Sequence, residues 1–472
     1  MKKKKLAKII LLAMPLILGM TGYFIVDGRP FLQSLYISIK LYGFGAEETP
    51  PNTIIEIARW VGPVATASTI VAVVALLRRG IHNIIANIGG NSTAVYGPDK
   101  LKDNMLKQLG KKGIDGRDKF VEADNYILLD SEDKNLAFYE KHRKKLADNE
   151  VFAKSDSLSA QWASEHNLHL FCPEEIAASV FWKEHCIYPL SRQCDHKMKI
   201  AVLGFDKLGR ELILSALQSN IFSSVQQLSY HIWGDADGFL NIHHQLSQIE
   251  DNIVFHYKNW YEEIGFLNQC NMIIVTAQDN QSDLVRKLLL ATDCKKIYLF
   301  SAADCNIRLI ENSDRITPFD WTKTAFCAKN ILENELFEKA KLLNLRYKNL
   351  YNNVEENSKN KELCWQKLNT FTRYSNISAA DFYDIMKYIL ICENQPADIE
   401  QLPEDWVDRL ANLEHIRWCR YHYLNNWKYG KVENGTKDVK NRIHADLVPY
   451  DTLSDSEKEK DKENIRILFS LG

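Results

Sequence analysis

A repeating order of short apolar strands, turns and helices, from Met198 to about residue 301, constrains the fold of this chain more than any other feature. The stretch MKIAVLGFDKLGRELILSAL reads as a strand, a glycine turn and a helix. Four further strand candidates follow at helix-length intervals: SYHIWGD, DNIVFHY, NMIIVTAQDN and KKIYLFSA. Strands that alternate with helices pack as a parallel sheet with helices on both faces. The sequence therefore predicts a doubly wound α/β unit within residues 191–330.

A second, shorter α/β unit is predicted upstream, in residues 81–190. Thr93–Tyr96 reads as a strand, Gly97 as a turn and Asp99 as the first residue of a helix. ADNYILLDSEDKNLAFYEKHRKKLADNEVFAKS then adds a strand, a helix and a strand. LHLFCPEEIAASVFWKEHCIYPL, which follows, is expected to be a helical connector.

The composition is that of ordinary folded protein, with 46% hydrophobic and 25% charged residues in a chain of 472. A net charge of −2 gives no strong field for nucleic acid, so no nucleic-acid partner is expected. The ten cysteines contain no CxxC pair and are expected to be reduced thiols. His185, Cys186, Cys194 and His196 match no familiar zinc spacing, and no metal site is predicted.

Two apolar runs near the N-terminus predict a transmembrane hairpin in residues 1–80. LAKIILLAMPLILGMTGYFIV follows four lysines, and VGPVATASTIVAVVALL ends at Arg78 and Arg79. About 20 apolar residues cross a bilayer, and flanking basic residues mark its cytoplasmic side. We therefore expect two spans in the inner membrane, with both termini in the cytoplasm. A cleaved signal peptide is the alternative for the first run, but no small-residue cleavage site follows Val26.

The segment between the runs, RPFLQSLYISIKLYGFGAEETPPN, is apolar enough to re-enter the bilayer. With the two spans it resembles the pore unit of two-span potassium channels, and Gly43, Phe44 and Gly45 resemble the end of their selectivity filter. No threonine–valine pair precedes these glycines, and the charge of Lys40 would oppose cation conduction. The alternative is a hairpin anchor with an amphipathic outer helix.

Gly204, Asp206 and Gly209 occupy the three glycine positions of the dinucleotide fingerprint G-x-G-x-x-G, with aspartate at the second. That glycine lets a pyrophosphate approach the backbone, whereas aspartate adds bulk and repulsion. Asp235, at the end of the second strand, stands where a ribose-binding acid would lie. A weak nucleotide site at these four residues and a purely structural scaffold are both compatible with the pattern.

Two spans followed by two Rossmann-type units resemble the RCK-type (TrkA-N) regulator subunits of potassium channels. In that family, ligand binding to paired cytoplasmic units moves the pore helices. The resemblance covers residues 6–310 and depends on the order of the elements more than on motifs.

Residues 331–364 read as a charge-rich helical linker, and residues 365–472 as a small all-α domain. WQKLNTFTRYSNISAADF, LANLEHIRWCRYHYLNNWKYG and NRIHADLVPYDTLSDSEKEKDKENIR resemble the RyR domain, the small helical repeat of ryanodine receptors that also occurs in bacterial proteins. On this resemblance we predict a ligand pocket formed by Arg373, Asn376, Glu414, His415, Arg417, Trp418, Trp427, Tyr429 and His444.

Arg417 lies in the apolar stripe of a helix expected over residues 410–430, where a buried charge needs a partner. Glu414 lies three residues earlier, on the same helix face, and Trp418 lies beside the pair. Two interpretations follow. Either the guanidinium and the indole rings hold a planar, charged ligand, or Glu414 and Arg417 form an internal ion pair.

The resemblances together imply a membrane α-helical hairpin, two RCK-like α/β units and a RyR domain. The implied function is a ligand-gated, channel-like effector that senses a nucleotide-type second messenger, with a role in antiphage defence. We expect a homo-oligomer, dimer or tetramer, in contact with the lipid bilayer, and no enzyme. The cofactor is unassigned beyond a nucleotide-derived ligand. The alternatives are a non-conducting, membrane-anchored sensor or scaffold, and an NAD(P)-dependent enzyme, which Asp206 disfavours.

Overall fold

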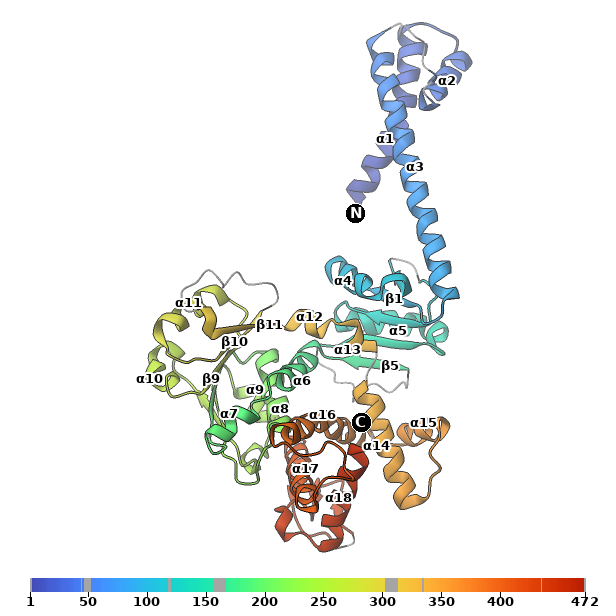
Figure 1. Ribbon diagram of the computed structural model, residues 1–472. Helices are drawn as coiled ribbons and strands as arrows, with labels where there is room; N and C mark the ends of the chain where they lie inside the picture. Colours follow the sequence, from blue (N-terminus) through green and yellow to red (C-terminus); the bar gives the residue numbers. More distant parts are fainter. Residues whose placement is uncertain are drawn as a thin grey trace. The chain divides into compact units, whose positions relative to one another are not determined.

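The chain divides into two compact units, Met1–Ser92 and Thr93–Gly472. The computed structural model (Figure 1) describes residues 2–43, 45, 52–117, 120–156, 167–301, 313–332, 335–433 and 435–470.

The first unit is helical. It consists of α1 (Lys2–Met20), which continues as a π-helical turn (Thr21–Val26), α2 (Phe31–Lys40), a 3-10 turn (Leu41–Gly43) and α3 (Thr53–Ile88). Small residues let these helices approach closely: a Cβ atom on Gly19 would lie 2.6 Å from Ser38 Oγ. A Cβ atom on Gly62 would lie 2.3 Å from the Leu41 carbonyl oxygen. A larger residue at either glycine would force the helices apart.

The expected membrane hairpin is wrong. With it fall the two spans, the inner-membrane location, the ligand-gated channel-like function and the membrane-anchored alternative. Among the described residues, no helix is both long enough and apolar enough to cross a bilayer. In α1 the uncharged stretch starts after Lys8 and the regular helix ends at Met20, which falls short of the about 20 residues that a span needs. In α3 the stretch between Arg59 and Arg78 is diluted by glycine, proline, serine and threonine.

Gly43 and Gly45, two of the residues that resemble a selectivity filter, lie at a tight turn. Gly43 ends the 3-10 turn after α2, and the Gly45 N–H donates to the Lys40 carbonyl oxygen at 3.1 Å. Phe44 lies outside the described residues. The backbone groups of Lys40 and Gly45 are hydrogen-bonded to each other and close a turn within the first unit.

The second unit begins with a five-stranded sheet of order β2-β1-β3-β4-β5, parallel throughout. We call it sheet A. Its elements are β1 (Thr93–Tyr96), α4 (Asp99–Leu109), β2 (Gly113–Asp115), β3 (Asn125–Leu128), α5 (Glu132–Leu146), β4 (Glu150–Lys154) and β5 (Leu168–Phe171). The LHLF segment, expected to begin a helical connector, is the edge strand β5, because Leu168 and Leu170 are buried on sheet A. The connector helix α6 (Pro173–Glu184) starts directly after it.

A six-stranded parallel sheet follows, with the Rossmann-like order β11-β10-β9-β6-β7-β8. We call it sheet B. Its strands are β6 (Lys199–Leu203), β7 (Ser229–Trp233), β8 (Asn252–His256), β9 (Met272–Val275), β10 (Ile297–Ser301) and β11 (Ile316–Asp320). Its helices, with those that flank it, are α7 (Tyr188–Gln193), α8 (Lys207–Ser219), α9 (Asp237–Ile242), α10 (Ile264–Leu267), α11 (Gln281–Ala291), α12 (Trp321–Ala325) and α13 (Ala328–Leu332). The five predicted strands are present, and β11 is a sixth.

The C-terminal part is not all-α. Its helices are α14 (Glu335–Asn352), α15 (Ser358–Gln366), α16 (Thr370–Cys392), α17 (Glu404–Leu424) and α18 (Asp455–Phe469). Between α17 and α18 lies a small three-stranded sheet, here called the ribbon, formed by β12 (Lys428–Tyr429), β14 (Ile443–His444) and β13 (Lys437–Asp438) in that order.

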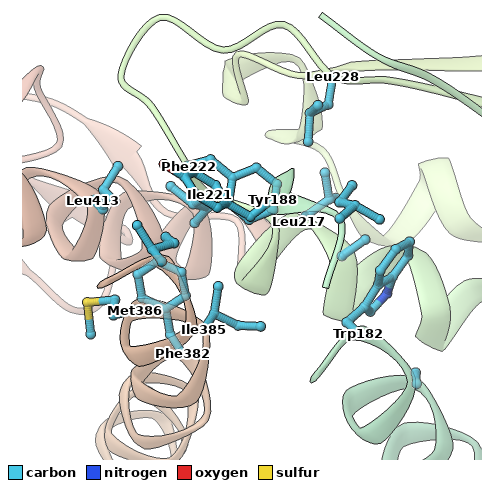
Figure 2. Packing of buried hydrophobic residues seen from close by; sticks show 14 of the residues in the cluster. Trp182, Tyr188, Leu217, Ile221, Phe222, Leu228, Phe382, Ile385, Met386 and Leu413 are labelled. Carbon is cyan, nitrogen blue, oxygen red and sulfur yellow. The ribbon is translucent and has the colours of Figure 1, made fainter. Parts of the chain in front are cut away.

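One apolar core joins the C-terminal helices to sheet B. Figure 2 shows Phe382, Ile385 and Met386 of α16 close to side chains of α7 and α8, such as Tyr188 and Leu217. Because these side chains belong to one buried hydrophobic cluster, the C-terminal helices and sheet B form one packed body.

Candidate functional site

Helix α17 places charged and aromatic side chains on different sides. Glu404 in its first turn suits the positive end of the helix dipole, and Asn426, with a φ of 59°, reverses the chain just after its end. Arg417 and Arg420 are almost fully buried, each 1% exposed. Trp418 is half-buried on another side of the helix.

Glu414 and Arg417 form an internal ion pair. Arg417 Nε and Nη2 donate to the two carboxylate oxygens of Glu414, both at 2.8 Å. Its Nη1 donates to Ser378 Oγ at 2.9 Å, and the Ser378 hydroxyl in turn donates to Gln218 of α8 at 2.9 Å. This forked geometry is the strong form of an arginine–carboxylate contact. The guanidinium is therefore engaged inside the fold, and a ligand would have to displace these partners.

His415 is held as a cation. Its Nδ1 lies 3.1 Å from Asp461 Oδ2, and its Nε2 lies 2.9 Å from the Val448 carbonyl oxygen. Since both oxygens only accept, both ring nitrogens donate. Burial alone would lower the pKa of His415, but the hydrogen bonds with Asp461 and Cys419 raise it to about 11. The Cys419 thiol, 3.5 Å from Nε2, therefore has no free base beside it, and burial raises the pKa of that thiol.

Four rings form a cluster over the outer side of α17, here called the aromatic cluster: Trp418, His422, Trp427 and His444. The Trp418 centroid lies 4.0 Å from that of His422 and 4.9 Å from that of His444. The His422 centroid lies 5.4 Å from that of Trp427. Three of the predicted pocket residues are therefore brought together, and His422 joins them.

The two histidines of the aromatic cluster are neutral, with defined tautomers. The Trp418 carbonyl oxygen, 2.8 Å from His422 Nδ1, requires that this nitrogen carry the proton. His444 Nδ1 accepts from the Asp446 N–H at 3.2 Å, so its proton lies on Nε2. Burial lowers the pKa of His422 to about 3 and that of His444 to about 4. The cluster is thus an apolar, polarizable floor without its own charge.

The ribbon sets a polar row beside this floor. Tyr429 of β12 and Lys437 of β13 are both paired in register with His444 of β14. Residues directly opposite on neighbouring strands share one face of a sheet. Tyr429 is 54% exposed, Lys437 is exposed, and the Lys437 ammonium contributes to the low pKa of His444. A phenol and an ammonium thus stand on either side of a buried imidazole, here called the ribbon row.

The remaining pocket residues lie apart from this row. Arg373 Nε and Nη2 donate to the Trp365 and Gln366 carbonyl oxygens at 3.0 and 2.8 Å, closing the end of α15. Asn376 is half-buried on α16. Arg373 therefore caps a helix instead of facing the aromatic cluster.

The fingerprint loop of sheet B is closed. The Asp206 carboxylate accepts from the Gly209 N–H at 3.3 Å, occupying the helix N-terminus where a pyrophosphate would bind. A Cβ atom on Gly204 would lie 2.4 Å from the Ala277 backbone nitrogen, so β6 and β9 are in backbone contact at the switch point. The Asp235 carboxylate accepts from the N–H of Asp237, the first residue of α9, at 3.1 Å. In this conformation the four residues predicted to bind a nucleotide make contacts within the fold instead.

Sequence reasoning missed the buried pair between Arg420 and Asp251. Arg420 Nη1 donates to Asp251 Oδ2 at 2.7 Å and to the Leu217 carbonyl oxygen at 3.2 Å. The available signal was Arg420 itself, three residues after Arg417 in the same helix. Its partner, in the loop before β8, carried no signal.

Two half-buried carboxyl groups on the neighbouring helices α6 and α8, Glu175 and Glu211, were also missed. Burial, then the charge of Asp381, raises the pKa of Glu175 to about 7. Burial, then the charge of Glu175, raises that of Glu211 to about 8. In the parts of the chain that the structure describes, no group of three histidine, cysteine or acidic side chains is placed to hold a metal ion.

Comparison with known proteins identifies one part of the chain. The sequence pattern of the RyR domain family matches residues 395–471, which include α17, the ribbon and α18. Among solved structures, one of the polypeptides of dipicolinate synthase from Bacillus halodurans matches over 53% of this chain and 97% of its own, at 12% identity and a TM-score of 0.25. So low a score carries no argument about function.

Proposed function

We propose that this chain is a regulatory binding protein, not an enzyme, and that its RyR-type module binds a small, planar, anionic ligand of the nucleotide type. The proposed site is the ribbon row with the aromatic cluster behind it. The two parallel sheets would act as regulatory units next to this site.

The observation that carries the proposal is the ribbon row: Tyr429, His444 and Lys437 side by side on one face. An exposed phenol ring can stack on a base, and an ammonium can pair with a phosphate. Within residues 428–442 the basic residues outnumber the acidic ones: Lys428, Lys431, Lys437, Lys440 and Arg442 are exposed, against the exposed Glu433 and the half-buried Asp438. This excess favours an anion beside Lys437, whereas the Asp446 carboxylate lies 3.8 Å from His444 Nδ1.

A regulatory role is supported by two other candidate sites, the fingerprint loop of sheet B and the His415–Cys419 pair, whose groups are already bonded within the fold. The Asp206 carboxylate fills the helix end that would bind a pyrophosphate. His415 donates through both nitrogens and cannot act as a base toward Cys419. We therefore propose the ribbon row as the ligand site, in preference to the fingerprint loop and the His415–Cys419 pair.

The test is calorimetric titration of the full chain with a panel of mononucleotides, cyclic mononucleotides and cyclic dinucleotides. One class is expected to bind. Tyr429→Ala and Lys437→Ala are each expected to weaken binding about ten-fold or more, since a stacked base or a charged hydrogen bond contributes about 1–3 kcal/mol.

Matched controls are Tyr257→Ala, an 89% exposed tyrosine next to β8, and Lys440→Ala, an exposed ribbon lysine outside the row. Both should bind as the wild type does. Failure of the whole panel to bind, or binding that Tyr429→Ala and Lys437→Ala leave unchanged, would exclude this site.

A further inference from the structure

We infer that two copies of this chain pair through β8, an edge strand of sheet B, as antiparallel neighbours across a two-fold axis. Such an assembly is independent of the ligand site proposed above.

The two edges of sheet B differ in what they offer to another strand. The strand order ends with β11 on one side and β8 on the other, and the described ranges contain no strand beyond either. β11 carries Pro318, which has no N–H to donate. The β8 sequence, NIVFH, contains neither proline nor lysine, with which natural proteins block edge strands. Val254 in β8 is 38% exposed, and Tyr257, directly after the strand, is 89% exposed. One edge is therefore blocked, and the other can accept a strand.

The backbone of β8 has groups that point away from the sheet. The Asn252 N–H donates to the Leu228 carbonyl oxygen at 2.8 Å, on the β7 side. The backbone groups of successive residues in a strand point to opposite edges, so those of Ile253 and Phe255 point away from β7. These are the groups that a further strand would bond.

A second β8 fits this edge in an antiparallel register with Val254 on the two-fold axis. Ile253 then lies opposite the partner's Phe255, and the two residues exchange backbone hydrogen bonds. Val254 lies opposite its own copy as a non-hydrogen-bonded pair, in which side chains approach most closely. An apolar side chain thus covers an apolar side chain at the centre of the contact.

Charge complementarity favours a second copy in this register. Glu250 and Lys258 lie two residues beyond the two ends of β8, both exposed, and the register places Glu250 opposite the partner's Lys258. Glu250 also contacts Arg420 at 3.4 Å, yet its side chain is 52% exposed. Glu250 and Asp251 set two negative charges against the one positive charge of Arg420, so one negative charge is left for the partner's Lys258. The two-fold axis repeats this attraction on the other side.

The test is analytical ultracentrifugation of the full chain over a wide range of concentration. The wild type is expected to form dimers, and hydrogen exchange in the β8 segment should slow as they form. Glu250→Lys and Lys258→Glu should each raise the dissociation constant by about ten-fold or more, because each sets like charges opposite one another twice. An equimolar mixture of these two variants should dimerise about as well as the wild type, because a mixed dimer restores both opposite-charge pairs.

Lys295→Glu is the matched control, because Lys295 is an exposed lysine just before β10, away from the β8 edge. It should dimerise as the wild type does. Val254→Lys should also weaken the dimer by about ten-fold or more, without touching the contact of Glu250 with Arg420. A wild-type chain that is monomeric at every concentration would overturn the inference. So would a dimer that Val254→Lys and both charge reversals leave intact, or charge-reversal variants that do not recover when mixed.

Discussion

Arginine 417 and arginine 420 are both buried on α17, and both are paired, but with different parts of the molecule. Arg417 binds Glu414 of its own helix, and Arg420 binds Asp251 of the α/β part. Removing one partner of a buried pair leaves the other charge uncompensated in a medium of low polarity. Both arginines should therefore affect stability before they affect binding.

Replacement of Arg417 by alanine is expected to lower the free energy of unfolding by about 3–5 kcal/mol, because the Glu414 carboxylate would remain buried alone. Urea denaturation monitored by circular dichroism measures the change. Arg417→Met combined with Glu414→Leu should cost clearly less than Arg417→Ala, since neither charge is then left. If Arg417→Ala left the stability unchanged but abolished ligand binding, the result would support the alternative in which Arg417 binds the ligand.

His415 predicts a loss of stability in alkali. Its pKa is about 11 in the fold and about 6.5 when unfolded, so the folded state binds the proton more tightly. This contribution is complete below about pH 6.5 and is lost as the pH rises toward 11, by at most about 1.4 kcal/mol per pH unit. Comparing the unfolding free energies of wild type and His415→Gln from about pH 7 to about pH 9 isolates the effect. Parallel pH profiles would contradict it.

At the scale of elements, α17 is shared between two surfaces. One side carries the aromatic cluster with Trp418, and another inserts Arg420 against the end of α8 and the loop before β8. The Arg420–Asp251 ion pair therefore ties α17 to the loop before β8. The pair thus locks the RyR-type module to sheet B.

Arg420→Met is expected to destabilise the protein by about 3–5 kcal/mol and to increase hydrogen exchange in β8, because Asp251 would lose its counter-charge. Arg409→Met is the control: this arginine is half-buried on the same helix and stacks on Trp406 at 4.4 Å. It should change the unfolding free energy by less than about 1 kcal/mol. Equal effects of the two substitutions would show that Arg420 has no special role.

At the scale of the whole molecule, sheet B shares its apolar core with the C-terminal helices, whereas sheet A has a separate apolar cluster. The core, of which Figure 2 shows a part, includes Ile200 and Val202 of sheet B and side chains of the C-terminal helices. Sheet A has its own cluster around Val95 and Ile127. Two elements that share a core lose their packing together. The RyR-type module and sheet B should therefore unfold as one cooperative body.

Phe382→Ala tests this cooperativity, since Phe382 is 1% exposed in the shared core. A loss of about 3–5 kcal/mol is expected, with hydrogen-exchange protection falling in sheet B and in α16–α18 alike. Sheet A should keep most of its protection. Loss confined to the C-terminal helices would mean that the two parts fold separately.

By itself, the sequence determined the two parallel sheets and the RyR-type module, because buried strands, glycine turns and a densely matched motif are written in neighbouring residues. The sequence wrongly predicted a transmembrane span near the N-terminus, because an apolar run need not form one continuous α-helix. Here α1 ends at Met20 and a π-helical turn follows. Only the tertiary structure decided what depends on distant neighbours. Strand β11 tolerates Pro318 because it lies at the edge of sheet B, where a missing N–H costs no ladder bond. Arg420 finds Asp251 across 169 residues, a pairing that no local pattern contains.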